Sequence, residues 1–297
     1  MSNFDVTIVF AVKNEEIYVE SAVGSVLNQT GLRCEVVVVD DGSSDGTFGT
    51  LSRLAREHES LRLFRNPGAG KCAAFNYGVR RATGQFVCLF AGDDLMPAGS
   101  LAARWGMVEN YPKDIPVVGL CKLLTMSTIK RFDGHLVPRR PGRGALSGVS
   151  PLMNRLVLEK IFPVPEMLPN EDTWMELAIT SFPNWQVVHS DVVGCAWRVH
   201  EGNSINMLSD FDDYNKRITS RIRAVPLFYE QYGSELTEEG RQRLRAKIEC
   251  EQNRIQGNII RILSSKVGFV DKLRSLSIAN RFFYGVRRKL YGILSGW

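Results

Sequence analysis

A pair of adjacent carboxylates follows a run of four valines. Asp40 and Asp41 come directly after Val36–Val39 and open the segment Asp-Asp-Gly-Ser-Ser-Asp-Gly-Thr. In an open parallel sheet, ligands lie beyond the carboxyl ends of the strands. Carboxylates there can accept hydrogen bonds from a nucleobase N–H or a ribose hydroxyl. We interpret this pair as functional, because two like charges side by side need a reason. Asp45, by contrast, is expected to cap a helix or close a turn.

A second acidic pair follows another apolar segment. Asp93 and Asp94 come shortly after Phe86–Phe90. Hard carboxylate oxygens suit Mg²⁺ or Mn²⁺ that also bridges to phosphates. Such an ion would offset the charge on a pyrophosphate leaving group. An acidic turn before a helix is the alternative. The metal interpretation gains support because both acidic pairs end strands that are expected to be near neighbours.

Three residues further along the chain complete the candidate chemistry. Asp172, in the segment Pro169–Trp174, is either a helix cap or a general base that projects into a cleft. His200 can bind a metal or donate to a phosphate, and Arg198 can balance phosphate charge. Each of these residues, taken alone, is also compatible with a structural role.

Strands and helices are expected to alternate over the first part of the chain. The apolar pattern predicts strands at 6–12, 36–39, 61–65 and 86–90, with helices at 15–28, 45–58 and 71–82. Continuous apolar strands separated by helices imply a mostly parallel sheet that is covered on both faces. Further on, Ser150 is expected to cap a helix that runs through Ile161, and another helix is expected to start near Asn170.

The last part of the chain has a different texture. Beyond about residue 210, charged and helix-favouring residues predict long helices over 211–231 and 237–264. Residues 252–297 hold nine Lys or Arg and one acid, Asp271. Within this part, residues 280–294 mix aromatic and basic side chains at roughly helical spacing. Such a helix either lies on an anionic membrane or packs on the rest of the protein with a solvated basic face. The pattern leaves both interpretations open.

Composition excludes several classes of protein. The 297 residues are 44% apolar, which excludes disorder as the main state and allows one large or two modest domains. The net charge of +5 is too small for a protein that coats nucleic acid, so no nucleic-acid partner is expected. We expect no membrane-spanning helix and no signal peptide. Six cysteines without a CxxC pair predict reduced core thiols in a cytoplasmic protein.

Taken in order, these segments resemble family 2 glycosyltransferases of the GT-A fold. The resemblance covers roughly residues 4–205. It is carried by the ordered set of segments Thr7–Glu15, Val38–Thr47, Gly70–Gly78, Ala82–Gly84, Gly92–Pro97, Glu171–Asp172 and Arg198–His200. It implies an α/β, Rossmann-like, mostly parallel sheet with helices on both faces, followed by a helical C-terminal extension. The expected GT-A domain spans 1–208, with a nucleotide-binding half at 1–95 and an acceptor-binding half at 96–208, before a helical region at 209–297.

The resemblance also implies roles for the matching positions. Asp172 matches the catalytic base, which deprotonates the acceptor hydroxyl. Asp94, together with His200, would hold the metal, Mn²⁺ or Mg²⁺. Glu171 and Trp174 are candidate acceptor contacts. The donor-binding residues would be Ala11, Asn14, Glu15, Asp41, Lys71, Asp93 and Arg198.

Two positions depart from the family pattern. Ala91 stands where many relatives carry a further Asp, which bears on the metal site. Lys13 replaces the aromatic residue that is usual in the first motif, so contacts to the nucleotide are expected to differ there.

The leading hypothesis is an inverting, metal-dependent glycosyltransferase. It would move a sugar from a UDP-, dTDP- or GDP-linked donor to a hydroxyl of a glycan or lipid-linked glycan, in polysaccharide or cell-envelope synthesis. One alternative is a metal-dependent phosphohydrolase or nucleotidyltransferase, which would not need Asp172. Another is a non-catalytic module that binds a nucleotide sugar or a glycan. The expected location is cytoplasmic, and a membrane surface is an expected peripheral partner through residues 276–297.

Overall fold

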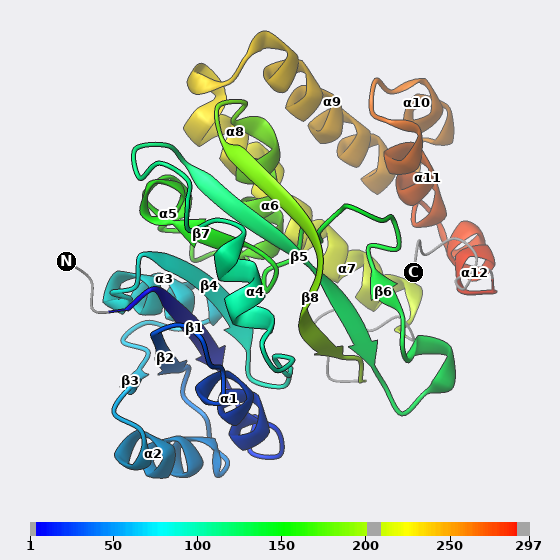
Figure 1. Cartoon of the computed structure of the whole chain (residues 1–297). Coiled ribbons are helices and arrows are strands. Elements are labelled where there is room, and N and C mark those ends of the chain that lie inside the picture. The colour runs from blue at the N-terminus through cyan, green and yellow to red at the C-terminus, as the bar shows by residue number, and fades with distance from the viewer. Residues whose placement is uncertain (1–3, 201–208, 290–297) are drawn as a thin grey trace. The chain divides into compact units, whose positions relative to one another are not determined.

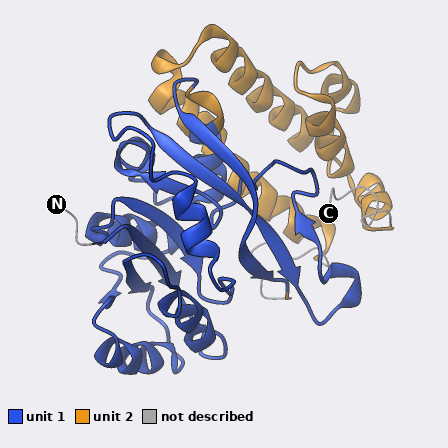
Figure 2. Ribbon diagram, in the orientation of Figure 1, with its two compact units in different colours: residues 1–179, 183–199 blue, residues 180–182, 200–297 orange. Residues whose placement is uncertain are grey.

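The computed structural model describes residues 4–200 and 209–289, and the chain divides into two compact units (Figure 2). The first unit comprises residues 1–179 and 183–199, and the second comprises 180–182 and 200–297. The expected domain boundary, between residues 208 and 209, comes at the end of residues 201–208. This segment falls outside the described residues. The division in the structure comes at 199/200.

The first unit contains a single mixed sheet with helices around it (Figure 1). Its strands are β1 (Val6–Val12), β2 (Cys34–Asp40), β3 (Leu61–Arg65), β4 (Phe86–Ala91), β5 (Val117–Met126), β6 (Leu136–Val137), β7 (Leu152–Asn154) and β8 (Gln186–Arg198). Its helices are α1 (Val19–Leu27), α2 (Thr47–Glu57), α3 (Lys71–Arg81), α4 (Ser100–Gly106), α5 (Arg155–Ile161) and α6 (Asp172–Ser181), the last of which ends among the residues grouped with the second unit.

The sheet has a parallel half and a mixed half. The strand order is β3-β2-β1-β4-β7-β5-β6, with β8 paired to β5. β3, β2, β1 and β4 are parallel, as the alternation of apolar strands and helices predicts. β7 then runs antiparallel to both β4 and β5, and β8 runs parallel to β5. The predicted α/β fold, with its mostly parallel sheet, is confirmed.

The parallel half is covered on both faces, which explains its unbroken apolar strands. Alternate residues of a strand point to opposite faces. Ile8 and Phe10 join a core cluster with apolar residues of α1 and α2. Val9, on the other face, lies against α3, where a methyl group on Gly78 would sit 2.4 Å from its Cγ1. Because both faces are buried, the strands read as continuous apolar runs rather than as an alternating pattern.

The expectation of a helix capped by Ser150 is wrong. Residues 152–154 form the strand β7, and α5 begins only at Arg155. The capping residue is Asn154, whose side chain accepts a hydrogen bond from the backbone N–H of Val157 at 3.2 Å. Ser150 is fully buried and its hydroxyl bonds the backbone of Cys121. Pairing with two neighbouring strands outweighs the local helical pattern here.

The second unit is helical in its described part. Its helices are α7 (Phe211–Ile222), α8 (Ala224–Tyr232), α9 (Glu238–Ile255), α10 (Ile259–Ser264), α11 (Phe269–Ser277) and α12 (Arg281–Lys289). Asp210, Thr237 and Asn258 cap three of them through their side-chain oxygens. Across both units, no described helix is long and apolar enough to span a membrane.

We expect Gly78→Ala to destabilise the protein. The added methyl would lie 2.4 Å from Val9 Cγ1 and 3.2 Å from Val39 Cγ2, and valine side chains have little freedom to move away. Overpacking of this kind costs about 1–3 kcal/mol of unfolding free energy. Gly49→Ala, on the exposed side of α2 with open space at its Cβ, is the matched control and should stabilise by about 0.5–1 kcal/mol. Equal urea midpoints for the two variants would contradict the close packing of α3.

Candidate active site

Three parallel strands end together and bring the predicted donor-binding segments to one edge of the sheet. β1 lies between β2 and β4, with Val12 opposite Asp40 and Ala11 opposite Ala91. The chain leaves these strands at Lys13, at Asp41 and at Gly92. The half-buried Ala11 therefore sits in the strand between the two acidic segments. The two acidic pairs lie one strand apart, as expected for neighbouring strand ends.

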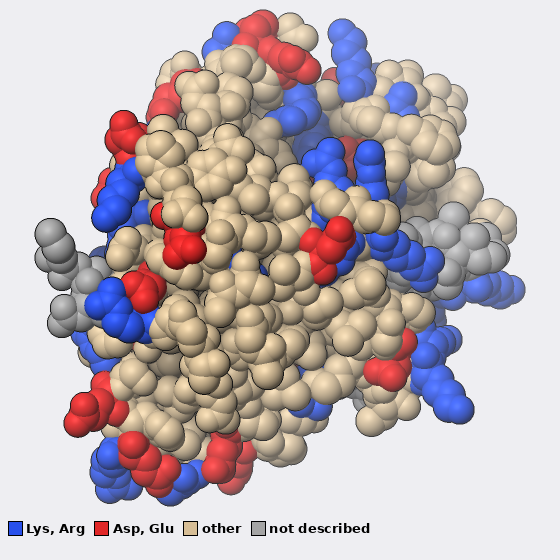
Figure 3. All heavy atoms as spheres, viewed as in Figure 1, with Lys and Arg blue, Asp and Glu red and all other residues tan. Residues whose placement is uncertain are grey.

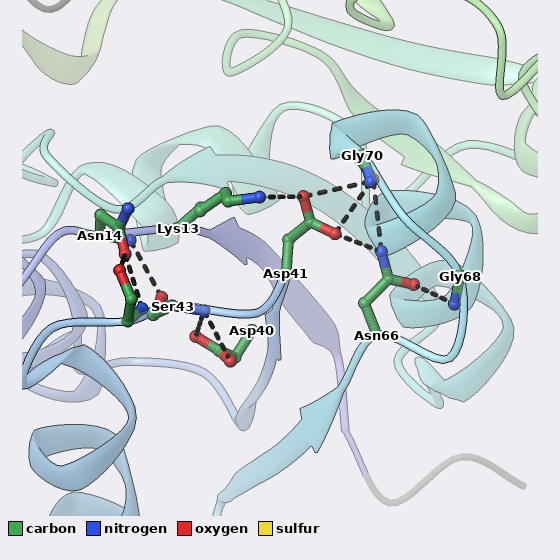
Figure 4. Close-up of polar contacts among 9 residues, drawn as sticks. Lys13, Asn14, Asp40, Asp41, Ser43, Asn66, Gly68 and Gly70 are labelled. Atoms are coloured by element: carbon green, nitrogen blue, oxygen red, sulfur yellow. Dashed lines mark hydrogen bonds and ion pairs between the residues drawn. The ribbon is translucent and has the colours of Figure 1, made fainter.

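Asp41 is held by the turn that opens α3 (Figure 4). Its carboxylate accepts hydrogen bonds from the backbone N–H of Gly70 at 2.9 and 3.1 Å and from the side-chain amide of Asn66 at 2.7 Å. Lys13 Nζ lies 3.9 Å from the same carboxylate. Gly70 has a φ of +93°, which favours glycine at this position. The ends of β1, β2 and β3 are thereby joined through one side chain.

Asp40 faces away from Asp41 (Figure 4) and has a different role. It is fully buried, and both of its carboxylate oxygens lie 3.3 Å from the backbone nitrogen of Ser43, which donates to them. The interpretation of the two adjacent carboxylates as one functional pair is therefore wrong for Asp40. Successive residues at a strand end point to opposite sides, so only Asp41 reaches the edge where the other predicted residues gather.

Asn14 fixes the loop that follows Asp41. Its side-chain oxygen accepts from the backbone N–H of Ser44 at 2.9 Å, and its backbone N–H donates to Ser43 Oγ at 2.9 Å. Its φ of +56° lies in the left-handed region, which Asn tolerates better than most residues. Asp45 accepts from the backbone N–H of Thr47 at 3.0 Å and closes the turn before α2, as predicted.

Glu15 lies beside the second acidic segment and carries an unusual pKa. Burial, together with the nearby charges of Asp93 and Asp45, raises the pKa of its carboxyl to about 7. A methyl group on Gly92 would lie 3.1 Å from Glu15 Cγ, so the backbone after β4 passes close to this side chain. Glu15 is thereby placed between the two acidic segments.

Asp94 is buried and bound by β8. Only 2% of it is exposed, and burial together with the charge of Asp93 raises the pKa of its carboxyl to about 8. Its oxygens lie 2.8 Å from the backbone nitrogen of Arg198 and 3.5 Å from Cys195 Sγ, both of which donate to it. An antiparallel bridge between Leu95 and Ala196 holds the two segments together.

Arg198 reaches back over the same strand end. Its Nε donates to the backbone oxygen of Asp93 at 2.8 Å, and its guanidinium lies 4.4 Å from the ring centroid of Tyr18. Residues more than one hundred positions apart in sequence therefore meet at the end of β4. The structure brings together Asp93, Asp94 and Arg198, three of the predicted site residues.

An ion pair connects the start of α3 with the start of α6. Lys71 Nζ lies 3.1 Å from Glu171 Oε1, and Glu171 is 2% exposed. Burial raises the pKa of the Glu171 carboxyl, whereas the Lys71 charge lowers it. The second oxygen, Oε2, is buried without a hydrogen-bond partner among the described residues. Two segments of the predicted site, one hundred residues apart, are joined by this contact.

Asp172 follows Glu171 as the first, half-buried residue of α6. The loop at Gly148 packs against both carboxylates, because a methyl there would lie 2.5 Å from Glu171 Oε1 and 3.4 Å from Asp172 Oδ1. Trp174 is fully buried, and its indole N–H donates to the Ile161 backbone oxygen at 3.0 Å. It therefore packs in the core, and the structure does not offer it as an acceptor contact.

The acidic edge has the chemistry that suits a divalent cation. Asp94 and its neighbour Asp93 put two carboxyl groups in one turn, and their repulsion contributes to the raised pKa of Asp94. A bound cation would relieve this repulsion, and carboxylate oxygens are ligands of Mg²⁺ and Mn²⁺. Within residues 4–200 and 209–289, no group of three or more His, Cys, Asp or Glu side chains is arranged to hold a metal. His200 is grouped with the second unit, and its metal role stays a prediction.

Some residues of this edge were missed by the sequence analysis. Asn66 and Gly70 bind Asp41, Cys195 contacts Asp94, and Gly148 leaves room for Glu171. Asn66 directly follows β3, so the rule applied to Asp41 would have found it. Nothing in the spacing indicates Cys195 or Gly148, because their contacts depend on β8 and on the loop after β6.

Comparison with known proteins finds similarity to glycosyltransferases. Residues 7–132 match the family model described as Glycosyl transferase family 2. An uncharacterized glycosyltransferase of Rickettsia conorii is 24% identical over 254 residues, which is 79% of this chain and 39% of that protein. The GalNAc(5)-diNAcBac-PP-undecaprenol beta-1,3-glucosyltransferase of Campylobacter jejuni is 31% identical over 91 residues, covering 30% of this chain and 29% of that protein. The chain spans less than half the length of these curated relatives.

Solved structures share the fold. TarS 1–349 of S. aureus, in complex with UDP-GlcNAc, is similar with a TM-score of 0.60 at 16% identity, over 98% of this chain and 89% of that one. The mannosyltransferase PcManGT of Pyrobaculum calidifontis, in complex with GDP-Man and Mn²⁺, is similar with a TM-score of 0.57 at 18% identity, over 96% of this chain and 75% of that one. The first unit has the GT-A fold. The match to the family 2 model over residues 7–132 falls within this unit.

We expect the raised pKa of Glu15 to appear in the pH dependence of stability. Its pKa of about 7 exceeds the ordinary value of 4.5, so the folded protein holds this proton more tightly than the unfolded chain. The stabilising effect is complete below the unfolded pKa and is lost as pH rises through the folded pKa. Relative to Glu15→Gln, the wild type should lose unfolding free energy on the order of 1 kcal/mol between about pH 5 and about pH 8.

Urea unfolding at a series of pH values measures this difference. Glu109→Gln, which changes an exposed carboxyl of the same unit, is the control. A wild-type minus Glu15→Gln difference that stays constant across the range would contradict the assignment.

Proposed function

We propose that this chain is an inverting glycosyltransferase that moves a sugar from a nucleotide-sugar donor to an acceptor hydroxyl. The observation that carries the proposal is the Lys71–Glu171 ion pair at 3.1 Å, because it ties the strand-end carboxylates to the start of α6, where Asp172 lies. The proposed donor-binding residues and the proposed base belong to one compact unit. The alternatives considered from sequence, a phosphohydrolase or a binding module, would not need Asp172 as a base.

On the donor side, the edge formed by β1, β2 and β4 would receive the nucleotide. Asp41 and Asn14 would face the base and ribose, and Asp93 would contact the ribose. Lys71 and Arg198 supply positive charge for the diphosphate. The UDP-GlcNAc and GDP-Man complexes of similarly folded proteins support a nucleotide-sugar donor. UDP-, dTDP- and GDP-sugars are the candidates.

The proposed cofactor is a divalent metal, Mn²⁺ or Mg²⁺. Asp94 would hold it, with the neighbouring Asp93 and the predicted ligand His200 as the other protein groups considered. When bound, such an ion acts as a Lewis acid that stabilises negative charge on the departing diphosphate. The Mn²⁺ complex of the Pyrobaculum protein supports this choice.

On the acceptor side, Asp172 is the proposed general base. It would take the proton of the acceptor hydroxyl as that oxygen bonds to the anomeric carbon and the bond to the nucleoside diphosphate breaks. Attack from the face opposite the leaving group inverts the anomeric configuration. Glu171, which is bound to Lys71, is better suited to positioning this end of α6 than to proton transfer. A glycan or lipid-linked glycan acceptor is supported by the name of the Campylobacter relative.

We expect Asp172→Asn to keep donor affinity and to lose transfer by about 10²-fold or more, because the amide cannot take a proton. Donor affinity is measured by calorimetry with a panel of UDP-, dTDP- and GDP-sugars, with and without Mn²⁺. Transfer is measured with glycan and lipid-linked acceptors. The exposed Asp114→Asn, which makes the same chemical change away from the site, is the control.

Two outcomes would contradict the proposal. Transfer by Asp172→Asn at the wild-type rate would remove Asp172 as the base. Binding of nucleotide sugars without turnover of any donor would favour the binding module instead.

A membrane surface is the proposed further partner, through the C-terminal helices. The structure gives α12 two different faces. Tyr284 is buried against Tyr214, and its hydroxyl donates to the Ser209 backbone oxygen at 2.9 Å. Phe282 is 74% exposed and Val286 is 39% exposed, among the basic residues of the same helix. One face therefore packs on α7, and the other has the composition of an interfacial helix. Residues 290–297 lie outside the described residues.

We expect Phe282→Ser combined with Val286→Ser to reduce recovery of the protein with anionic vesicles by about threefold or more, because buried apolar area and basic charge act together in interfacial binding. These substitutions spare the face that packs on α7, whereas deletion of residues 276–289 would also remove Tyr284 from its contact with Tyr214. Ile129→Ser, at an exposed apolar residue of the first unit, is the control. Vesicle recovery equal to that control would leave α12 as a packing element alone.

A further inference from the structure

The second unit contains a hollow that the proposed transfer reaction does not use. It is an open depression of about 350 Å³, lined by Asn215, Lys216, Thr219, Ser220, Arg223 and Ile255. Five of these residues lie on α7 or directly after it, and Ile255 is the last residue of α9. None of the six is acidic. The lining instead combines two cationic side chains with two hydroxyl groups and one amide.

A buried arginine binds two of the residues that line the hollow, Asn215 and Thr219. Arg254 is 1% exposed and is neutralised by Glu251, with Nε–Oε2 and Nη2–Oε1 distances of 2.6 Å. Its remaining hydrogen bonds go to the side-chain oxygen of Asn215 and, at 2.8 Å, to Thr219 Oγ1. Because Thr219 Oγ1 accepts this bond, its own O–H is available to donate elsewhere. The buried network therefore fixes two lining residues in position.

Three other lining residues carry donor groups that have no partner in the described part of the chain. Among the described residues, the side chains of Lys216, Ser220 and Arg223 make no hydrogen bond or ion pair. Two acids of the neighbouring helical turns are already engaged, since Asp212 pairs with Arg281 at 2.6 Å and Glu251 pairs with Arg254. An ammonium, a guanidinium and hydroxyl donors around one depression match an oxyanion with several acceptor atoms.

We propose that this hollow binds a phosphate group of an anionic ligand. Lys216 and Arg223 would supply the charge, and Ser220 and Thr219 would donate hydrogen bonds to the phosphate oxygens. The phosphate is carried either by a lipid headgroup or by a soluble phosphorylated molecule. This site is separate from the strand-end carboxylates of the first unit and does not depend on the proposed transfer reaction.

The surroundings of the hollow favour the lipid as the source. Ile255 is 59% exposed at its rim, and on the following helix α10 Ile260 is 79% and Leu263 is 54% exposed. In the view of Figure 3, basic side chains gather over α9 to α12. An exposed apolar residue in the lining, followed by exposed apolar residues on the next helix, suits the interfacial region of an anionic bilayer, where a headgroup phosphate lies beside acyl chains.

Binding is tested on the full chain with two probes. Inorganic phosphate is titrated by calorimetry at fixed ionic strength, and vesicles of phosphatidylcholine with and without phosphatidylglycerol are used in co-sedimentation. The Lys216→Gln/Arg223→Gln variant should bind the probe at least about tenfold more weakly than the wild type, because two charge-assisted contacts are lost. Ser220→Ala should weaken binding by about two- to fivefold. The control Arg56→Gln/Lys113→Gln removes the same charge from exposed positions of the first unit.

Loss of binding in the hollow variants, and not in the control, supports the site. Binding of inorganic phosphate would then show that the phosphate alone is sufficient, whereas binding only to vesicles with phosphatidylglycerol would identify the lipid as its source. The phosphate arm does not involve the exposed face of α12, so it separates this site from the proposed membrane helix. Absence of wild-type binding to both probes, or equal binding by the hollow variant and the control, would overturn the proposal.

Discussion

Repulsion between carboxylates at one end of a parallel sheet is the constraint on which the rest of the first unit depends. Parallel strands end at the same edge, so acidic residues that follow them are forced into proximity in a region of reduced dielectric. Asp41 is accommodated by N–H groups of Gly70 and Asn66, and Asp94 by the backbone of Arg198. The pKa of the Glu15 carboxyl is raised to about 7, so this group holds its proton more readily and adds less negative charge to the edge. The edge is therefore prepared for a ligand that brings positive charge or hydrogen-bond donors.

Two later segments of the first unit, β8 and the start of α6, contact the residues of this edge. β8 delivers Arg198 and Cys195 to Asp94, and the start of α6 delivers Glu171 to Lys71. This ion pair joins a buried Glu171 to a Lys71 side chain that is 42% exposed. It is no strong source of stability, because solvent screens the lysine and desolvation of the carboxylate offsets much of the Coulomb energy. Its effect here is geometric, since it fixes where α6 begins relative to α3 and hence where Asp172 lies. The proposed base is thus positioned by a residue on the donor side.

Local pattern predicted most of the parallel half and failed where distant segments meet. The strands over 6–12, 61–65 and 86–90 form where their apolar runs indicate, because both faces of this sheet are buried. The helix expected after Ser150 is partly a strand, since β7 is completed by pairing with β4 and β5. The helices beyond residue 210 are also shorter than the helical pattern of the sequence predicts. That pattern continues without interruption across the breaks between α7 and α8 and between α9 and α10.

The sequence by itself determined which residue types follow which strands, and hence that carboxylates, a lysine and an arginine were available for nucleotide-sugar chemistry. Only the tertiary structure decided which of them face the same edge. It separated Asp41 from Asp40, joined Lys71 to Glu171, and placed Trp174 in the core. The physical reason is that side-chain direction at a strand end and contacts between segments one hundred residues apart depend on how the chain packs, and no local spacing encodes that packing.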